Sequence, residues 1–322
     1  MALSQKSRAA ADVCNKQLEH LMPALTPLGI VMGFLLPGIF IQLRPMVAAL
    51  FGMITFSGAL NLRTGAFVQC MRRPLPILPA FISMHIIMPL AAFGVSSLFF
   101  PGDADTVTGF ILLYSGPAAV SGLLWVTLFR GDAALCLTLL FLDTLLAPLV
   151  TPATLLALMG TRTAMHTGGI ARSLCVMVVL PAAAGVTVNE ASRGKVPALI
   201  GPYLAPLSKL CLPLIIAANA SPVVPKARFG EPKVWAVAAL GILLSATGYL
   251  FANLGGLAGR LPPEKRIALF FTGGLRNISA VTSIAVEFFP EAAALPALLG
   301  IVFQQSLAAL MGRLFMGARH RR

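Results

Sequence analysis

An arginine followed by an asparagine, Arg276 and Asn277, lies in the middle of an otherwise apolar stretch of this sequence. A guanidinium carries five N–H donors in a planar fork that fits the two oxygens of a carboxylate. An arginine at the centre of a membrane helix costs about 2.5 to 3.5 kcal/mol on insertion scales, so it is expected to face a cavity or a partner. The chemistry that this pair could perform is therefore the binding of an anion.

Two more ionisable residues, Asp143 and His85, fall inside apolar stretches. Asp143 is the obvious partner of Arg276, and a structural ion pair is then the alternative to anion binding. A histidine titrates near neutral pH, so His85 could carry a proton if it reaches the same cavity. The alternative for His85 is a neutral imidazole that hydrogen-bonds a neighbouring helix. Both residues are candidates for ion coupling.

Two segments rich in glycine and small polar residues, residues 115–122 and 272–279, interrupt long apolar stretches near their middles. Unwound backbone halfway across a bilayer frees carbonyls, amides and helix ends, which can hold a solute. For the serines of the first break, capping of freed backbone groups is the alternative. The candidate substrate contacts at the two breaks are Arg276, Asn277, Thr272, Ser115 and Ser121.

The composition is that of an integral membrane protein, because 57% of the 322 residues are hydrophobic, 11% are charged, and the mean hydropathy is +0.87. In soluble domains about a quarter of the residues are charged. Apolar stretches of roughly 17 to 25 residues predict spanning helices, so the expected fold class is all-α. Ten spans are expected, over residues 21–43, 45–62, 74–100, 106–129, 133–160, 173–189, 202–224, 235–259, 267–286 and 292–312.

Most of the 24 lysine and arginine residues fall in alternate loops, which places both termini in the cytoplasm and the chain in the cell (inner) membrane. Residues 1–20 are expected to form a polar cytoplasmic tail. Ten helices divide into five and five, and an odd number in each half gives an inverted repeat, over residues 21–160 and 161–322. The two breaks then fall in the fourth and ninth helices, at matching places in the two halves, as at a midplane binding site.

Several function classes are excluded by what the sequence lacks. It has no His-Glu-x-x-His, no Gly-x-Ser-x-Gly and no phosphate-binding loop that ends in Gly-Lys-Ser or Gly-Lys-Thr, so we expect no enzyme. The five cysteines are scattered without a Cys-x-x-Cys pair, so we expect no metal and no other cofactor. The net charge of +13 originates in the loops, so the expected partners are the lipid bilayer and a small molecule, and no nucleic acid.

Several short motifs resemble those of the bile acid:sodium symporter family. They are Pro117 with the small residues after it, Arg130-Gly131, Pro148, Thr151-Pro152, Gly274-x-x-Asn277, and Phe51 to Gly58 in the second expected helix. The resemblance implies a ten-helix fold with a panel domain of helices 1, 2, 6 and 7 and a core domain of helices 3 to 5 and 8 to 10. The two broken helices would cross in that core. It also implies transport of organic anions, usually with two sodium ions.

The sodium ligands that the resemblance implies are mostly replaced in this chain. The family has a Ser-Asn pair after the first break, a serine and a threonine on the fifth helix, a shared acidic residue, and two glutamines. In the same order these positions hold Gly122 and Leu123, Cys136 and Leu140, Thr272, and Arg276 and His85. Of the implied ligands only Asn277 is present. Since sodium needs several oxygen ligands and a fixed guanidinium repels it, the sequence argues against sodium coupling.

Three functions fit this sequence. The first is a secondary active or facilitative transporter of a small or amphipathic organic anion, in which Arg276 supplies the charge that sodium supplies in relatives; the coupling ion is then H+ or Na+, or transport is exchange. The second is an arsenite or metalloid exporter of a related fold, although Ala118 stands where that chemistry needs a cysteine and Cys136 lies too far along the chain. The third is a non-transporting membrane receptor.

Overall fold

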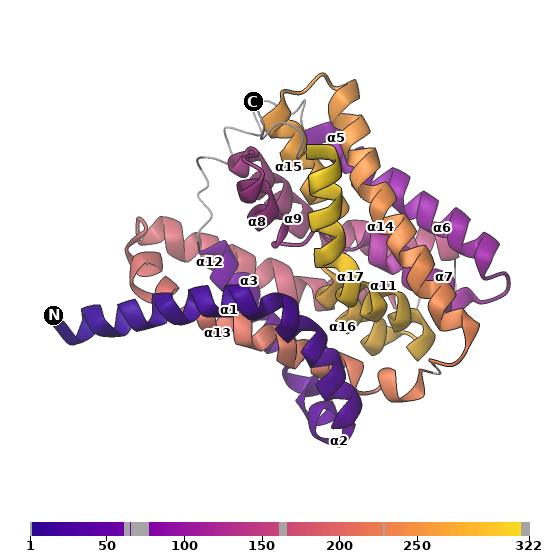
Figure 1. The fold of residues 1–322 in the computed structure, drawn as a ribbon, viewed down its shortest axis with the longest axis horizontal. Helices are drawn as coiled ribbons and strands as arrows, with labels where there is room; N and C mark the ends of the chain where they lie inside the picture. Colours follow the sequence, from indigo (N-terminus) through magenta and orange to yellow (C-terminus); the bar gives the residue numbers. More distant parts are fainter. Residues whose placement is uncertain (1, 61–64, 66–76, 161–165, 228, 317–322) are drawn as a thin grey trace. The chain divides into compact units, whose positions relative to one another are not determined.

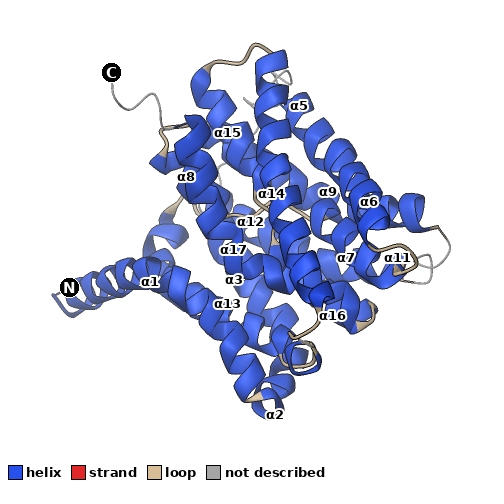
Figure 2. Cartoon of the chain, turned by 45° about the vertical axis from the view of Figure 1, so that its right-hand side comes forward, coloured by secondary structure: helices blue, strands red, loops and turns tan. Residues whose placement is uncertain are grey.

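The computed structural model describes residues 2–60, 65, 77–160, 166–227 and 229–316. Every regular element in these residues is a helix, and Figure 2 draws no strand in them. The single extended pairing among them is an isolated antiparallel bridge between Ala118 and Arg276. The expectation of an all-α protein is therefore confirmed.

The chain forms two compact units, each assembled from two separate segments of the sequence. The first unit comprises Met1–Thr64 and Ser173–Lys226, and the second comprises Gly65–Arg172 and Ala227–Arg322. Each unit therefore draws on both halves of the chain. The proposed inverted repeat of residues 21–160 and 161–322 stays a prediction.

The first unit is built around a long N-terminal helix. Its elements are α1 (Ala2–Leu35), α2 (Pro37–Phe40), a 3₁₀ segment η1 (Ile41–Met46), α3 (Val47–Ala59), a π-helical turn η3 (Cys175–Val179), α12 (Leu180–Ala191), α13 (Lys195–Ala220) and η4 (Val224–Lys226). Helix α1 runs beside α13 (Figure 1). A Cβ at Gly33 would lie 2.5 Å from the carbonyl oxygen of Ala217, so this close approach requires glycine.

One boundary expected in this unit differs from the structure, and another stays untested. Helix α1 runs without interruption from the polar residues into the apolar ones, so the polar tail expected over residues 1–20 is helical where the structure describes it, and its place in the cytoplasm stays a prediction. Polarity predicts whether a segment enters the bilayer, but residues such as Ala, Gln and Lys also favour helix. The expected first span also ends early, since Leu36 leaves the helical conformation before α2 begins at Pro37.

The second unit holds the remaining helices. They are α5 (Ile77–Ile82), a π-helical turn η2 (Ser83–Ile87), α6 (Met88–Phe99), α7 (Ala104–Ser115), α8 (Gly122–Leu128), α9 (Ala133–Met159), α14 (Pro232–Ala258), α15 (Pro263–Gly274), α16 (Ile278–Phe288) and α17 (Glu291–Met316). Helix α11 (Thr167–Leu174) straddles the boundary between the units. Within the second unit, α7 packs on α6 and α17, and α14 packs on α15 and α17.

Seven helical segments of the described residues are long and apolar enough to cross a membrane. They are Pro37–Ala59, Ile77–Phe99, Ala133–Met159, Thr167–Ala191, Lys195–Ala220, Pro232–Ala258 and Glu291–Met316. These segments identify a multi-pass membrane protein. The expected spans 106–129 and 267–286 are each divided into two shorter helices, so neither counts alone. The expected ends at residues 62 and 74 lie outside the described residues, and the total of ten spans stays a prediction.

Both divided spans break where the sequence disfavours helix. Helix α7 ends at Ser115, and the next residue, Gly116, is extended with a ψ of 163°. Pro117 then has no N–H to donate. In the other break, a Cβ at Gly274 would lie 2.2 Å from the ring of Tyr249, so only glycine allows this approach. The local sequence therefore favours the first break, whereas Gly274 at the second break is required by packing against Tyr249.

Candidate functional site

The two breaks lie against each other and complete each other's backbone hydrogen bonds. The N–H of Ala119 donates to the carbonyl oxygen of Leu275 over 3.0 Å, and the N–H of Asn277 donates to that of Pro117 over 2.7 Å. These bonds flank the bridge between Ala118 and Arg276. Backbone groups that each helix leaves free at its break are thus satisfied by the other break, as a low-dielectric environment demands.

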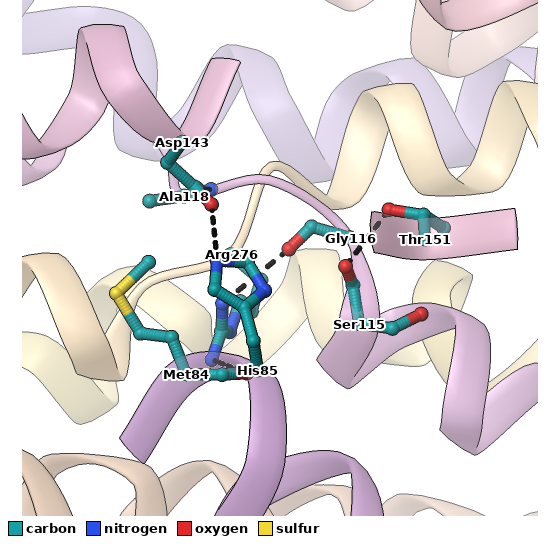
Figure 3. A network of polar contacts seen from close by, with 8 residues as sticks. All are labelled: Met84, His85, Ser115, Gly116, Ala118, Asp143, Thr151 and Arg276. Atoms are coloured by element: carbon teal, nitrogen blue, oxygen red, sulfur yellow. Dashed lines mark hydrogen bonds and ion pairs between the residues drawn. The ribbon is translucent and has the colours of Figure 1, made fainter. Parts of the chain in front are cut away.

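Arg276 projects from this crossing into the interior of the second unit, where 3% of its surface is exposed. Its Nη1 donates to the carbonyl oxygen of Gly116 over 3.3 Å, and its Nη2 donates to that of Met84 over 3.1 Å (Figure 3). Both acceptors are neutral backbone groups. No other hydrogen bond to a described residue engages the guanidinium, so its charge is held by dipoles rather than by a carboxylate.

The carbonyl of Met84 is available because of a proline. Met84 lies in the π-helical turn η2, where the N–H of Met88 donates to the carbonyl of Ser83. The next residue is Pro89, which has no N–H. The carbonyls of Met84 and His85, one of which would otherwise accept that donor, are left without it. Arg276 uses the first of these two oxygens.

His85 and Asp143 form the second part of the network. Nε2 of His85 lies 2.7 Å from Oδ1 of Asp143, and both side chains are buried. The other carboxylate oxygen, Oδ2, accepts the backbone N–H of Ala118. Asp143 on α9 therefore ties the π turn to the first break. Nδ1 of His85 is buried and has no hydrogen-bond partner among the described residues.

The contact expected between Arg276 and Asp143 is corrected by this geometry. Among the described residues no ion pair joins them, because the carboxylate is occupied by His85 and Ala118. Figure 3 shows Arg276, His85 and Asp143 gathered at the crossing of the breaks. The three ionisable residues singled out in the sequence thus share one network, with a different pairing.

The other two candidate contacts of the second break bond to the protein itself. The side-chain oxygen of Asn277 accepts the N–H of Ala280 over 3.3 Å, so Asn277 caps the N-terminus of α16. The hydroxyl of Thr272 donates to the sulfur of Cys136 over 3.5 Å. Neither side chain hydrogen-bonds Arg276. In this structure Asn277 positions α16, and Thr272 joins α15 to α9.

The serines of the first break also have partners in the protein. The hydroxyl of Ser115 donates to the carbonyl of Leu112 over 3.5 Å, and the hydroxyl of Ser121 accepts from Nε2 of Gln305 over 3.4 Å. The carbonyl of Ser115 in turn accepts the hydroxyl of Thr151 over 2.8 Å (Figure 3). The Ser115 contact stays within its own helix, and the Ser121 hydroxyl meets a side chain without capping α8, so backbone capping by these serines stays a prediction.

The positions that hold sodium ligands in the resembled family do not form an oxygen cage here. Cys136 and Leu140 are buried in an apolar cluster of the second unit, and Leu123 packs against the same cluster. Gly122 has no side chain, and a Cβ there would lie 3.6 Å from the nearest backbone oxygen. No group of His, Cys, Asp or Glu in the described part of the chain could hold a metal ion. The side chains of Leu123, Cys136 and Leu140 therefore offer no oxygen ligand at these positions.

Sequence reasoning missed the two acceptors of the guanidinium, since both are backbone carbonyls. A signal was present for one of them, since Pro89 follows Met84 by five residues. A proline inside an apolar span frees a carbonyl one turn earlier, and a buried arginine elsewhere in the chain needs such acceptors. The two facts together predict a contact that neither predicts alone.

The sequence model of a family described as the Sodium Bile acid symporter family matches residues 48–224, more than half of the 322 residues. The chain belongs to this family. The resemblance expected from the sequence motifs is confirmed.

Relatives in the Sodium Bile acid symporter family match most of the chain. "Uncharacterized protein YbaS" of Bacillus subtilis (strain 168) is 37% identical over 291 residues, which cover 90% of this chain and 95% of that protein. "Uncharacterized sodium-dependent transporter YocS" of the same organism is 28% identical and covers 83% and 81%. "Probable sodium/metabolite cotransporter BASS3, chloroplastic" of Oryza sativa subsp. japonica is 24% identical and covers 96% and 74%. The protein is therefore a membrane transporter of the symporter type.

Proposed function

We propose that this protein is a secondary transporter that moves an organic anion across the cell membrane, with the guanidinium of Arg276 as the point where the anion binds. The observation that carries the proposal is a buried arginine at the crossing of two broken helices, whose hydrogen bonds to described residues all go to backbone carbonyls. Its two hydrogen bonds use two of five N–H groups, which leaves three. A carboxylate or sulfonate could accept two of these side by side.

The helix that follows Arg276 adds to the attraction for an anion. Helix α16 (Ile278–Phe288) begins two residues after Arg276, so its N-terminal partial positive charge lies near the guanidinium. Asn277 caps this end and orients it. Positive potential from the side chain and from the helix end then falls on the same region.

We propose further that sodium does not drive this transporter, although the printed names of two relatives mention sodium. A sodium ion about 4 Å from a guanidinium would be repelled by about 4 kcal/mol at an effective dielectric of 20. Leu123, Cys136 and Leu140 offer no oxygen ligand in compensation. Arg276 would instead supply permanently the charge that a bound cation supplies elsewhere.

The two compact units support alternating access as the transport mechanism. The first unit contains the helices expected as the panel, and the second contains the two broken helices and the proposed site. We propose that the second unit moves against the first to expose Arg276 to each side in turn. The same proposal includes ten spans in an inverted repeat, insertion in the inner membrane, and both termini in the cytoplasm, supported by the distribution of basic loops.

We do not extend the proposal to metalloid export. That chemistry needs a reactive thiolate at the break, and the break holds Ala118. Cys136 is fully buried in the apolar cluster, and its sulfur accepts a hydrogen bond from Thr272. A thiol in this setting is an apolar packing residue.

The proposal is tested by flux into proteoliposomes. A panel of labelled carboxylates and sulfonates is offered in sodium and in potassium buffers, with the wild type, Arg276→Gln, and Arg266→Gln as a matched control. Arg266 bonds Asn253 at a helix end and has no contact with the network. We expect sodium-independent flux that Arg276→Gln lowers about 100-fold, since charge-assisted hydrogen bonds contribute about 1.5 to 3 kcal/mol each. Strong sodium dependence, or full flux in Arg276→Gln, would overturn the proposal.

A further inference from the structure

The charges in the buried network can take only two totals near neutral pH. Arg276 carries one positive charge and Asp143 one negative charge, and His85 is either neutral or positive. With neutral His85 the three residues sum to zero. With protonated His85 they sum to plus one. An anion bound at Arg276 therefore meets either a neutral network or a network with one positive charge to spare.

We propose that His85 takes up one proton for each monovalent anion that binds at Arg276, so that the protein is an electroneutral one-to-one symporter of protons and monoanions. This inference rests on the proposed function, because it requires that Arg276 bind the transported anion. It adds the coupling ion, the atom that carries it, and the charge of the substrate. No covalent bond changes, since the proton enters from one aqueous side and leaves to the other.

The atom that accepts the proton is Nδ1 of His85. A neutral imidazole has one nitrogen that donates and one that accepts. Nε2 lies 2.7 Å from Oδ1 of Asp143, and we assign the hydrogen of the neutral imidazole to Nε2 because of this contact. Nδ1 is then the basic nitrogen, and it is buried without a partner in the described residues. Once protonated, it becomes a buried donor that needs an acceptor, which an oxygen of the anion supplies.

The guanidinium of Arg276 is bonded to the same helical turn that carries the imidazole of His85. Nη2 of Arg276 bonds the carbonyl of Met84, the residue directly before His85. The π turn η2 therefore fixes the guanidinium next to the backbone that carries the imidazole. Figure 3 draws the two side chains together at the crossing. An oxyanion bound to Arg276 would therefore lie close to the turn that carries His85.

Coupling follows from the charges of the four loading states. The empty network and the network with both proton and anion each sum to zero. A proton alone leaves plus one, and an anion alone leaves minus one. An uncompensated charge in this buried region is strongly disfavoured, because the low-dielectric interior solvates it poorly. Only the empty and the doubly loaded forms are expected to change conformation readily, which links the two fluxes.

In the described part of the chain, the helices packed on the turn bring no other group that changes charge near neutral pH to His85. The turn packs against α5, α6, α7 and α14, and Asp143 reaches it from α9. Helices α5 and α6 contain no charged residue, and α7 and α14 contribute the phenols of Tyr114 and Tyr249, which are neutral near pH 7. The charged residues Asp105 and Lys233 lie in the first turns of their helices.

The inference is tested with the fastest monoanion of the flux panel, preferably a sulfonate. A sulfonate stays ionised at neutral pH, so it carries no proton of its own and does not leak as a neutral acid. An internal pH dye and the labelled anion are followed together, with the membrane potential set by potassium and valinomycin. We expect one proton per anion, accumulation driven by an inward proton gradient, and no response to the potential.

Two variants separate coupling from structure. In His85→Gln the network always sums to zero, so we expect net uptake to fall at least tenfold and the residual flux to carry charge. In Asp143→Asn the network sums to plus one without a proton. Net uptake should then fall at least tenfold, and by a larger factor than anion exchange, because the empty form retains a charge. Retained exchange also shows that this variant is folded, and a purely structural role would lower exchange and net uptake equally.

Each outcome decides between the two proposals. Wild-type flux of a panel anion without proton uptake, or with a net current, overturns the proton coupling and leaves the anion site at Arg276 standing. The same holds if Asp143→Asn loses exchange and net uptake to the same extent. Absence of flux for every panel anion overturns both proposals.

Discussion

Two π-helical turns, η2 and η3, each have a backbone carbonyl that accepts a hydrogen bond from a side chain, but the donors differ. Each is followed by a helix with proline at its second position, Pro89 in one case and Pro181 in the other. In η3 the carbonyl of Met177 accepts the hydroxyl of Thr55 over 3.3 Å. In η2 the carbonyl of Met84 accepts Nη2 of Arg276 over 3.1 Å.

The difference shows that the proline leaves a backbone carbonyl without its helical donor. The role of that carbonyl then depends on which side chain donates to it. A neutral hydroxyl that also bonds its own helix, as Thr55 bonds Phe51, completes the packing of two helices. A buried guanidinium carries a full charge, and neutral carbonyl dipoles stabilise that charge only in part. The first arrangement stabilises the fold, and the second leaves a site for a ligand.

Removing the charged donor is expected to have the largest effect on stability. In Arg276→Met the carbonyls of Gly116 and Met84 lose their donor, and Asp143 loses the nearby positive charge. We expect about 3 kcal/mol of destabilisation, the lower end for breaking a buried charge network. Unfolding in detergent micelles would measure it. A loss below about 1 kcal/mol would mean that the carbonyls do not depend on the guanidinium.

Replacing the proline after each turn, which restores a backbone N–H, should affect transport differently in the two cases. Pro89→Ala supplies a donor that competes for the carbonyls of Met84 and His85, which loosens the hold on Arg276. We expect anion flux to fall about tenfold, which corresponds to about 1.4 kcal/mol. Pro181→Ala is the matched control in η3, and its flux should equal the wild type. Equal losses in the two variants would show that the prolines act only through the fold.

Removing the neutral donor is expected to have a smaller effect. Thr55→Val keeps the shape of the side chain and deletes the hydroxyl that bonds Met177. A neutral hydrogen bond contributes about 1 kcal/mol, so the midpoint of unfolding should shift slightly. Flux per folded protein should not change. A loss of flux comparable with that of Pro89→Ala would contradict the distinction between the turns.

The smallest effect is expected at an exposed ion pair that belongs to neither turn. Nζ of Lys233 lies 2.7 Å from Asp103, the N-cap of α7. Burial raises the pKa of Asp103, but hydrogen bonds with Lys233 and Thr106 outweigh it and hold the pKa below the ordinary 3.8. The stability from the carboxylate is therefore present above pH 3.8 and is lost as the pH falls through the lower folded-state pKa.

Asp103→Asn would measure this contribution. It keeps the capping oxygen and removes the charge, so we expect a loss of about 0.5 kcal/mol near pH 7, as for other exposed pairs. The difference between variant and wild type should vanish in acid. A difference that persists well below pH 3 would mean that the amide disturbs the cap rather than the ion pair.

Hydropathy predicted most of the helices in this protein because burial in lipid selects apolar residues along a whole span. The expected spans 133–160 and 235–259 coincide closely with α9 (Ala133–Met159) and α14 (Pro232–Ala258). It did not predict the N-terminal extent of α1, because polar residues can continue a helix beyond the apolar part. Hydropathy measures polarity, and helicity there depends on local propensity and packing.

The site was predictable as a set of residues but not as a set of contacts. Charges inside apolar stretches identified Arg276, His85 and Asp143, which the structure brings together. The structure does not form the Arg276–Asp143 ion pair that was the alternative to anion binding, because the carboxylate lies against His85 and Ala118 instead. That choice depends on how α9 lies against the π turn, and no residue type encodes it. Pro89 could have indicated the backbone acceptor.

The bridge between Ala118 and Arg276 constrains how this protein can evolve. Its flanking bonds tie Ala119 to Leu275 and Asn277 to Pro117, so a shift of either segment displaces the other. A mutation that reshapes one break to admit a bulkier cargo must be compatible with the backbone of the second. We expect adaptive changes at these two stretches to arise as linked pairs, although they come from opposite halves of the chain.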